Sequence, residues 1–98
     1  MIEIPLQGGA VNAHQIFTMQ LGENTLDFTL NYVTLYDSWS LDIERDDVSL
    51  VNGAMLEPGS DIIKTYNAGI GKLIFVGDEP TLDNLGSANH LVWVPDDE

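Results

Sequence analysis

Residues 26–51 read LDFTLNYVTLYDSWSLDIERDDVSLV and contain three strand-like runs joined by two short turns. In the first run, residues 26–32, every second side chain is apolar and the residues between them are polar. Alternation with a period of two places the apolar side chains on one face of a β-strand. Residues 39–43 and 48–50 repeat the pattern, so this stretch predicts a three-stranded antiparallel meander with one apolar face.

Aspartate marks both turns of this meander, at residues 36–38 and at residues 45–47. Asp favours turns because its carboxylate bonds nearby backbone N–H groups and because it tolerates the left-handed backbone region. We therefore expect two tight connections, the second of them at Asp46-Asp47.

Strand character extends beyond the meander. Pro5 cannot donate to a ladder, so residues 1–6 are expected to form an edge strand or an extended arm. Residues 15–21 and 25–32 are expected to pair as a hairpin. The runs at 73–76 and 91–94 are apolar on both faces, which is typical of a sheet that is covered on both sides or that forms an interface.

Two further local signals concern residues 52–66. Asn52-Gly53 suits a type I′ hairpin turn, after which residues 54–56 would return as a short strand. Ser60 is a good helix N-cap, and residues 61–66 could form about two helical turns that end near Asn67 and Gly69. Together these patterns predict a mainly β fold, a small antiparallel barrel or sandwich of about seven strands with one short helix. We expect a single domain over residues 1–98, with an acidic tail at 96–98.

The composition excludes several function classes. The 98-residue chain has no cysteine, and its net charge is -13, because sixteen acidic residues oppose three basic ones. Nucleic-acid binding depends on Lys and Arg that replace phosphate counterions, so we expect no specific nucleic-acid contact. No run reaches the ~20 apolar residues of a membrane span. The opening MIEIPLQGG is unlike a signal peptide, which indicates synthesis in the cytosol.

Candidate catalytic residues are few. His14 and His90 could serve a Ser/His/Asp triad, but each lies in or beside a strand-like run and no nucleophile elbow accompanies them. The acidic pair Asp42 and Glu44 shares the solvent face of one strand, where solvated surface acids are the simpler interpretation. We therefore predict no catalytic residue and expect that the protein is not an enzyme.

Candidate ligand sites are equally weak. Calcium could use Asp46 and Asp47, but the EF-hand pattern is missing. The glycines before Lys72 resemble the end of a phosphate loop, yet the motif needs a glycine at Tyr66 and a hydroxyl residue at Leu73. Several aromatic residues could form a sugar platform, although core packing is the simpler interpretation: Tyr32, Tyr36, Trp39, Tyr66 and Trp93. We predict no cofactor and no metal site.

The order of motifs along the chain resembles the baseplate plug proteins of contractile-tailed bacteriophages. The pieces that carry the resemblance span nearly the whole length: Ile4-Pro5-Leu6, Phe17, residues 26–32, Trp39-Ser40-Leu41-Asp42-Ile43, Val48-Ser49-Leu50-Val51-Asn52-Gly53, Pro58-Gly59-Ser60-Asp61-Ile62-Ile63, Tyr66, residues 73–76, Asp83-Asn84-Leu85-Gly86 and residues 91–93. The turn after residues 39–43 commonly carries Asp-Gly in such proteins. Here it is Asp46-Asp47, which leaves the type of this turn open.

The resemblance implies a structural virion component of the tail baseplate that plugs the tail tube at the hub and spike. Its partners would be baseplate hub, spike and tail-tube proteins, with several copies around the tail axis and three as a candidate number. It implies no cofactor, no membrane contact and no catalytic residue. The alternative that the residues leave open is a standalone β binding module for carbohydrate or calcium.

A set of apolar side chains provides a candidate interface. The two-sided strands can bury one face in the core and offer the other face to a neighbouring chain. The first strand could add its apolar face to the same contact. The candidate interface residues are Ile2, Ile4, Leu6, Ile74, Val76, Val92 and Val94.

Overall fold

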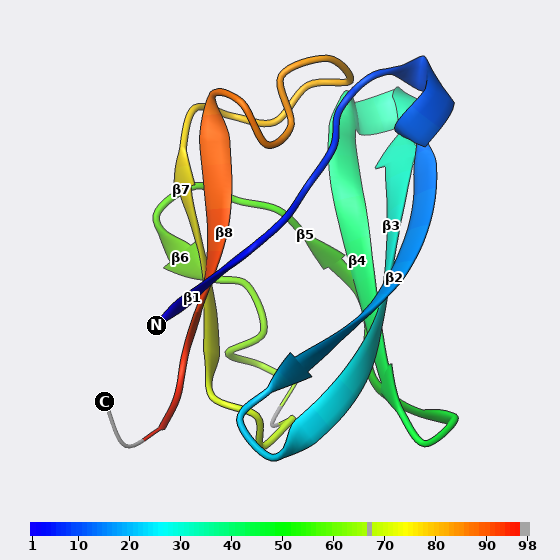
Figure 1. The fold of residues 1–98 in the computed structure, drawn as a ribbon. Helices are drawn as coiled ribbons and strands as arrows, with labels where there is room; N and C mark the ends of the chain where they lie inside the picture. Colours follow the sequence, from blue (N-terminus) through cyan, green and yellow to red (C-terminus); the bar gives the residue numbers. More distant parts are fainter. Residues whose placement is uncertain (67, 97–98) are drawn as a thin grey trace.

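The computed structural model describes residues 1–66 and 68–96, which form two four-stranded antiparallel sheets that face each other (Figure 1). The predicted mainly β class is confirmed, and the architecture is a sandwich of two separate sheets rather than a closed barrel. The eight strands are β1 (Ile2–Ile4), β2 (His14–Leu21), β3 (Asn24–Val33), β4 (Ser38–Arg45), β5 (Val48–Met55), β6 (Ser60–Asp61), β7 (Lys72–Gly77) and β8 (Asn89–Val94).

One sheet, which we call the meander sheet, has the order β2-β3-β4-β5. Each strand pairs with the next one in sequence, so the predicted meander and the predicted β2–β3 hairpin are both confirmed. Leu30 pairs with Leu41, and Phe28 pairs with Ile43. The apolar residues of the alternating pattern therefore form one continuous inner face.

The other sheet, which we call the terminal sheet, has the order β1-β8-β7-β6 and contains the first and last strands of the chain. As Pro5 predicted, β1 lies at an edge, where it pairs only with β8. The chain after β5 crosses from the meander sheet to β6, and the segment after β1 crosses back to β2 (Figure 1).

The inner faces of the two sheets bury a shared core. Its largest fully buried side chains are Trp39, Phe28 and Phe75. Phe28 and Trp39 come from the meander sheet, and Phe75 comes from β7 in the terminal sheet. The side chains of Leu73 and Leu91 are also fully buried. One face of each two-sided apolar strand, β7 and β8, is therefore committed to the core.

The β4–β5 turn at Asp46-Asp47 has a defined type in the structure. Arg45 pairs with Val48, so the loop has two residues. Asp46 has φ 53° and Asp47 has φ 64°. Positive φ at both central residues is the mark of a type I′ turn, the form that twists as the flanking strands do. The turn is therefore a type I′ hairpin turn, with aspartate where glycine is easier to accommodate.

The predicted hairpin at Asn52-Gly53 is wrong. β5 runs through these residues and stays paired with β4, with Leu41 opposite Ala54 and Ile43 opposite Val51. Asn52 and Gly53 of β5 thus lie opposite a single residue of β4, Asp42, and this arrangement is a β-bulge. Gly53 takes φ 79° at the bulge, so the feature that suggested a turn instead accommodates one extra residue.

The predicted helix at residues 61–66 is also wrong. Ser60 and Asp61 form the short strand β6, and residues 62–66 form hydrogen-bonded turns instead of a helix. The Asp61 carboxylate does bond the backbone N–H of Ile63, as a capping residue would, but it also accepts from Leu73 N–H. This second bond holds the segment against β7. Asn67 lies outside the described residues, as do residues 97–98 of the predicted acidic tail.

The β7–β8 connection is organised by Asn89, a buried polar residue with no exposed surface. Its side-chain oxygen accepts from Gly86 N–H, and its amide donates to the Asp78 carbonyl and to the Asn84 side chain. Two leucines of this loop pack on the core, where Leu85 is buried and Leu82 is partly buried. The network fixes a long polar loop against the end of the sandwich.

Candidate functional site

The outer faces of the two sheets differ in chemistry. The strand register places these side chains on the outer face of the meander sheet in three rows: His14, Asn31 and Ser40; Ile16, Thr29 and Asp42; Thr18, Asp27 and Glu44. On β5, Met55 continues the first row and Ser49 continues the third, so Ile16 and Met55 are the apolar residues of these rows. Such a face is suited to water and needs no protein cover.

The outer face of the terminal sheet carries four aliphatic side chains. Ile74 pairs with Val92 across β7 and β8, so the two side chains lie next to each other on the same face. Val76 and Val94 follow by alternation along the same strands. Val76 is 39% exposed, and the other three side chains are partly exposed. We call Ile74, Val76, Val92 and Val94 the terminal face.

Polar groups border the terminal face. Glu3 lies opposite Val92, and its carboxylate is 2.9 Å from His90 Nδ1. Lys72 lies opposite Val94, and Asp61 lies opposite Ile74. An apolar centre with a charged rim is the arrangement that protein–protein interfaces use.

The three other candidate interface residues are not part of this face. Ile4 is 1% exposed and packs in the core, and Leu6 packs against the core from the segment after β1. Ile2 pairs with Trp93, whose side chain points inward, so Ile2 lies on the inner side of the sheet edge. The buried Ile4 is therefore unavailable to a partner, and Ile2, which is 37% exposed, does not share the outer face of β7 and β8. An interface role for the remaining candidates stays a prediction.

The candidate catalytic residues do not converge. His14 Nδ1 contacts the Asn31 side chain, whereas His90 contacts Glu3. In the described part of the chain, no serine hydroxyl bonds either imidazole. Asp42 accepts a hydrogen bond from Gly53 N–H and so has a structural role.

No ligand site forms from the other candidates within residues 1–66 and 68–96. No group of three or more His, Asp or Glu side chains gathers there in a way that could hold a metal ion. Gly71 has φ 101°, and a Cβ on it would lie 2.5 Å from the Val94 carbonyl. This glycine therefore serves close packing against β8 rather than phosphate binding.

Both tryptophans belong to the core, as the simpler interpretation expected. Trp39 is fully buried and donates from Nε1 to the Thr81 carbonyl at 2.9 Å. Trp93 is 7% exposed and donates to the Ile70 carbonyl at 2.6 Å. Tyr32 packs edge-on against Trp39. These aromatic residues stabilise the sandwich and offer no flat stacking surface for a sugar.

A groove that the sequence analysis missed lies beside β2. Its volume is about 550 Å³, and it lies between the segment after β1 and the outer strand of the meander sheet. The lining residues are Pro5, Gln7, Asn12 and residues 14–19. Only the crossing of the first segment over the sandwich creates this groove. The one local signal was the strand HQIFTMQL itself, which contains neither a charged residue nor proline.

Comparison with known proteins agrees with the resemblance seen in the sequence. A family model described as cyanophage baseplate Pam3 plug gp18 matches residues 1–97. No curated protein matches the chain. Among the described residues, no helix has the length and apolar character needed to cross a membrane.

Proposed function

The chain belongs to the family of the cyanophage baseplate Pam3 plug gp18, and from this premise we propose that it closes the tail tube at the hub and spike of a phage baseplate. In this role it is a structural virion protein with no reactive centre of its own. Its partners are hub, spike and tail-tube proteins, and several copies surround the tail axis.

The observation that carries this proposal is the contrast between the two outer faces. A polar face such as that of the meander sheet is compatible with water, whereas four adjacent aliphatic side chains on paired strands favour burial. In the proposal, the terminal face docks on a neighbouring baseplate chain. The Glu3–His90 pair lies at the rim of that contact, where it would fix orientation more than affinity.

The net charge supports the same role. A protein with a charge of -13 at the end of a DNA conduit would not hold the genome, because it offers few cations to replace phosphate counterions. Such a plug can close the tube by its contacts with protein and still release DNA when those contacts break.

The test places one charge in the terminal face. Val92→Asp and Ile74→Asp bury a carboxylate if this face is an interface, and such a charge is costly without a partner. We expect both variants to remain folded by circular dichroism, and we expect baseplates assembled with them to lack the plug. Thr25→Asp is the matched control, because Thr25 is an exposed strand residue of the meander sheet.

The amount of plug in the assembled baseplates distinguishes docking through the terminal face from docking elsewhere. Loss of the plug with both terminal-face variants, but not with Thr25→Asp, supports the proposal. Baseplates that contain folded Val92→Asp plug in the wild-type amount would contradict docking through this face. Baseplates that never contain the wild-type chain would contradict the function itself.

A further inference from the structure

Three of the four sheet edges are protected against pairing with another strand. β1 has three residues, carries Glu3 and is followed by Pro5. β6 has two residues. The pairing of β5 with β4 is interrupted by two register shifts, one on each side of Ile43 of β4. Short strands, charged residues, proline and bulges are the usual means by which proteins prevent edge-to-edge association.

The fourth edge, β2, has none of these protections. It has eight residues, pairs in unbroken register with β3 from His14 to Leu21, and contains no charged residue and no proline. Long, regular and uncharged edges are the ones that accept another strand. Because the other three edges of the same molecule are protected, the open edge of β2 is an exception that calls for a partner.

The orientation of the β2 backbone follows from its pairing. Ala13, just before β2, accepts a hydrogen bond from Tyr32 N–H of β3. Along an antiparallel pair of strands, only every second residue exchanges backbone hydrogen bonds with the neighbouring strand. Odd-numbered residues of β2 therefore bond β3. The N–H and C=O groups of Ile16, Thr18 and Gln20 point instead to the open edge. An added strand would satisfy all of them.

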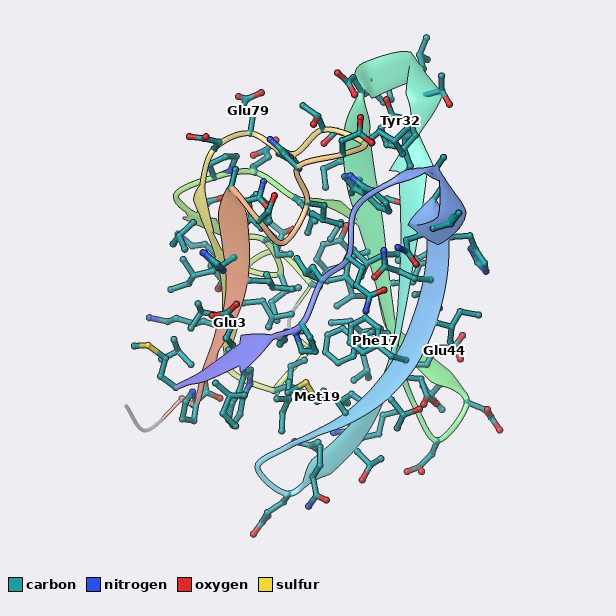
Figure 2. All side chains as sticks on the ribbon, turned by 45° about the horizontal axis from the view of Figure 1, so that its top comes forward. Glu3, Phe17, Met19, Tyr32, Glu44 and Glu79 are labelled. Atoms are coloured by element: carbon teal, nitrogen blue, oxygen red, sulfur yellow. The ribbon has the colours of Figure 1, made fainter. Side chains whose placement is uncertain are left out.

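The groove beside β2 provides room for the side chains of such a strand. Phe17 stacks on Phe28 with ring centroids 5.2 Å apart, and both Phe17 and Met19 are only partly buried. Figure 2 shows both side chains pointing from β2 toward the space between the two sheets. The groove of about 550 Å³ along residues 14–19 can therefore take alternate apolar side chains of an added strand.

The outer face next to β2 defines the charge of the partner. The row that begins at Thr18 continues with Asp27 and Glu44, and the row that begins at Ile16 ends with Asp42. The guanidinium of Arg45, at the end of β4, is bonded to the Asn24 side chain instead. Asp27 is the carboxylate nearest to the open edge, and it accepts a hydrogen bond from the Thr18 hydroxyl at 2.6 Å. Asp42 and Glu44 lie one strand farther away, on β4, and contribute only through their long-range charge. A strand with Lys or Arg on this side would therefore complement Asp27 first.

We propose that the open edge of β2 receives an extended segment of a neighbouring baseplate protein, which joins the meander sheet as a fifth strand. The segment places apolar side chains on Phe17 and Met19 and basic side chains toward Asp27. This inference rests on the proposed function, and it assigns a second contact, distinct from the terminal face, to the same plug. A second copy of this chain is a poor occupant, because each copy carries a charge of -13.

Proline at the open edge provides the main test. Thr18→Pro removes an N–H that points away from β3, together with an exposed hydroxyl that donates to Asp27. The fold is expected to tolerate both losses, while the added strand loses a hydrogen bond and meets the proline ring. Ser49→Pro is the matched control, because Ser49 is an exposed residue on β5, the opposite edge of the same sheet. We expect purified baseplates to contain at least about tenfold less Thr18→Pro plug than wild-type or Ser49→Pro plug.

Charge substitutions identify the occupant. We expect Thr18→Lys to lower the plug content of baseplates, because it repels a basic strand, and Thr18→Glu to leave it unchanged or higher. The opposite order would overturn the basic character of the segment. Free protein that sediments as a dimer, and that Thr18→Pro converts to a monomer, would assign the edge to a second copy and overturn the proposal.

A measurement on the wild-type chain covers the possibility that Thr18→Pro does not fold. We expect the amides of Ile16, Thr18 and Gln20 to exchange rapidly in the free protein and at least about a hundredfold more slowly in assembled baseplates. Equal exchange in both states would overturn the inference while leaving the plug function intact. Absence of the wild-type chain from baseplates would instead overturn the proposed function.

Discussion

The carboxylate of Asp42 accepts a hydrogen bond from the backbone N–H of Gly53, 2.7 Å away, across the bulge in β5. Asp42 faces two residues of β5, and its side chain bonds a backbone group that the interrupted ladder leaves without a strand partner. The bond thus explains how the Asn52-Gly53 sequence remains within a strand instead of turning the chain.

Removing this carboxylate should weaken the bulge. We expect Asp42→Ala to lower the free energy of unfolding by about 1 kcal/mol, because a charge-assisted bond to the backbone is lost at a partly exposed site. Urea denaturation measures the change. Glu44→Ala is the control, since Glu44 is exposed two residues further along the same face. Equal effects of the two substitutions would contradict a specific role for Asp42.

Glycine at the second turn position should stabilise the protein. Asp47 has φ 64°, a conformation that glycine adopts without steric cost. We expect Asp47→Gly to raise the free energy of unfolding by about 0.5 kcal/mol and Asp47→Val to lower it by about 1 kcal/mol. Thermal unfolding followed by circular dichroism measures both. A less stable Asp47→Gly variant would show that the Asp47 side chain contributes more than its backbone strain costs.

The buried amide of Asn89 should be essential for the loop at the end of the sandwich. Asn89→Leu leaves Gly86 N–H and the Asp78 carbonyl without their side-chain partner. We expect a loss of about 2–3 kcal/mol in the free energy of unfolding. Ser87→Ala, in the same loop but exposed, should cost much less. A small effect of Asn89→Leu would mean that the loop can rearrange to satisfy these groups.

Trp93 should contribute to the stability of the fold through its indole N–H as well as through its size. Trp93→Phe keeps an aromatic ring in the core but removes the donor to the Ile70 carbonyl. We expect a loss of about 2 kcal/mol, because the carbonyl is left without its bond and part of the ring volume becomes empty. Denaturant titration measures this loss. A glycan array gives a separate check: carbohydrate binding that a variant of the exposed Tyr36, Tyr36→Ala, loses while it keeps its fold would favour a binding module instead.

The hydroxyl of Tyr32 donates to the Asp37 carboxylate at 2.6 Å. This bond raises the pKa of Tyr32 above its ordinary value of 10.0, and partial desolvation and the negative charges of Asp37 and Asp83 act in the same direction. Because the folded-state pKa is raised, the contribution to stability is complete below the ordinary pKa and is lost as the pH rises through the folded value.

Asp37→Asn tests this linkage, because asparagine tolerates the left-handed backbone at this position and keeps an acceptor oxygen without the charge. We expect the tyrosinate absorbance of the variant to appear at lower pH than in the wild-type protein. Asp83→Asn, which removes only a more distant charge, should shift it less. Identical titration curves for wild-type and Asp37→Asn would contradict the assignment.

Period-two alternation predicted the meander sheet well, because one face of each strand is buried and the other is exposed. Residues 26–32 alternate this way in the sequence, and residues 26–31 of β3 alternate between buried and partly exposed. The two-sided apolar pattern of β7 and β8 was equally informative, since it marked strands with a core face and a second apolar face.

Local signals failed where a distant contact decided the structure. Asn52-Gly53 is a strong turn signal, but the bond from Gly53 to Asp42, eleven residues away, holds it in a strand. Asp61 has the side chain of a helix cap, yet its bond to Leu73 draws the segment into β6. Neither partner can be identified from the local sequence alone.

The candidate surfaces also differ in whether the local pattern or a distant contact decides them. The terminal face follows from alternation along β7 and β8, so its four residues could be named from the sequence. Ile4 has the same apolar character, but its place in the core depends on how β1 pairs with β8. The open edge of β2 depends on β1 pairing with β8 and not with β2, and the sequence pattern does not show which of the two β1 joins.

The most direct test of the central claim is cryo-electron microscopy of intact baseplates at a resolution that traces strands. We expect this two-sheet chain on the tail axis next to the hub, with Ile74 and Val92 covered by a neighbouring protein. Baseplates in which the axial position is filled by a different chain, with this one absent from the particle, would contradict the account.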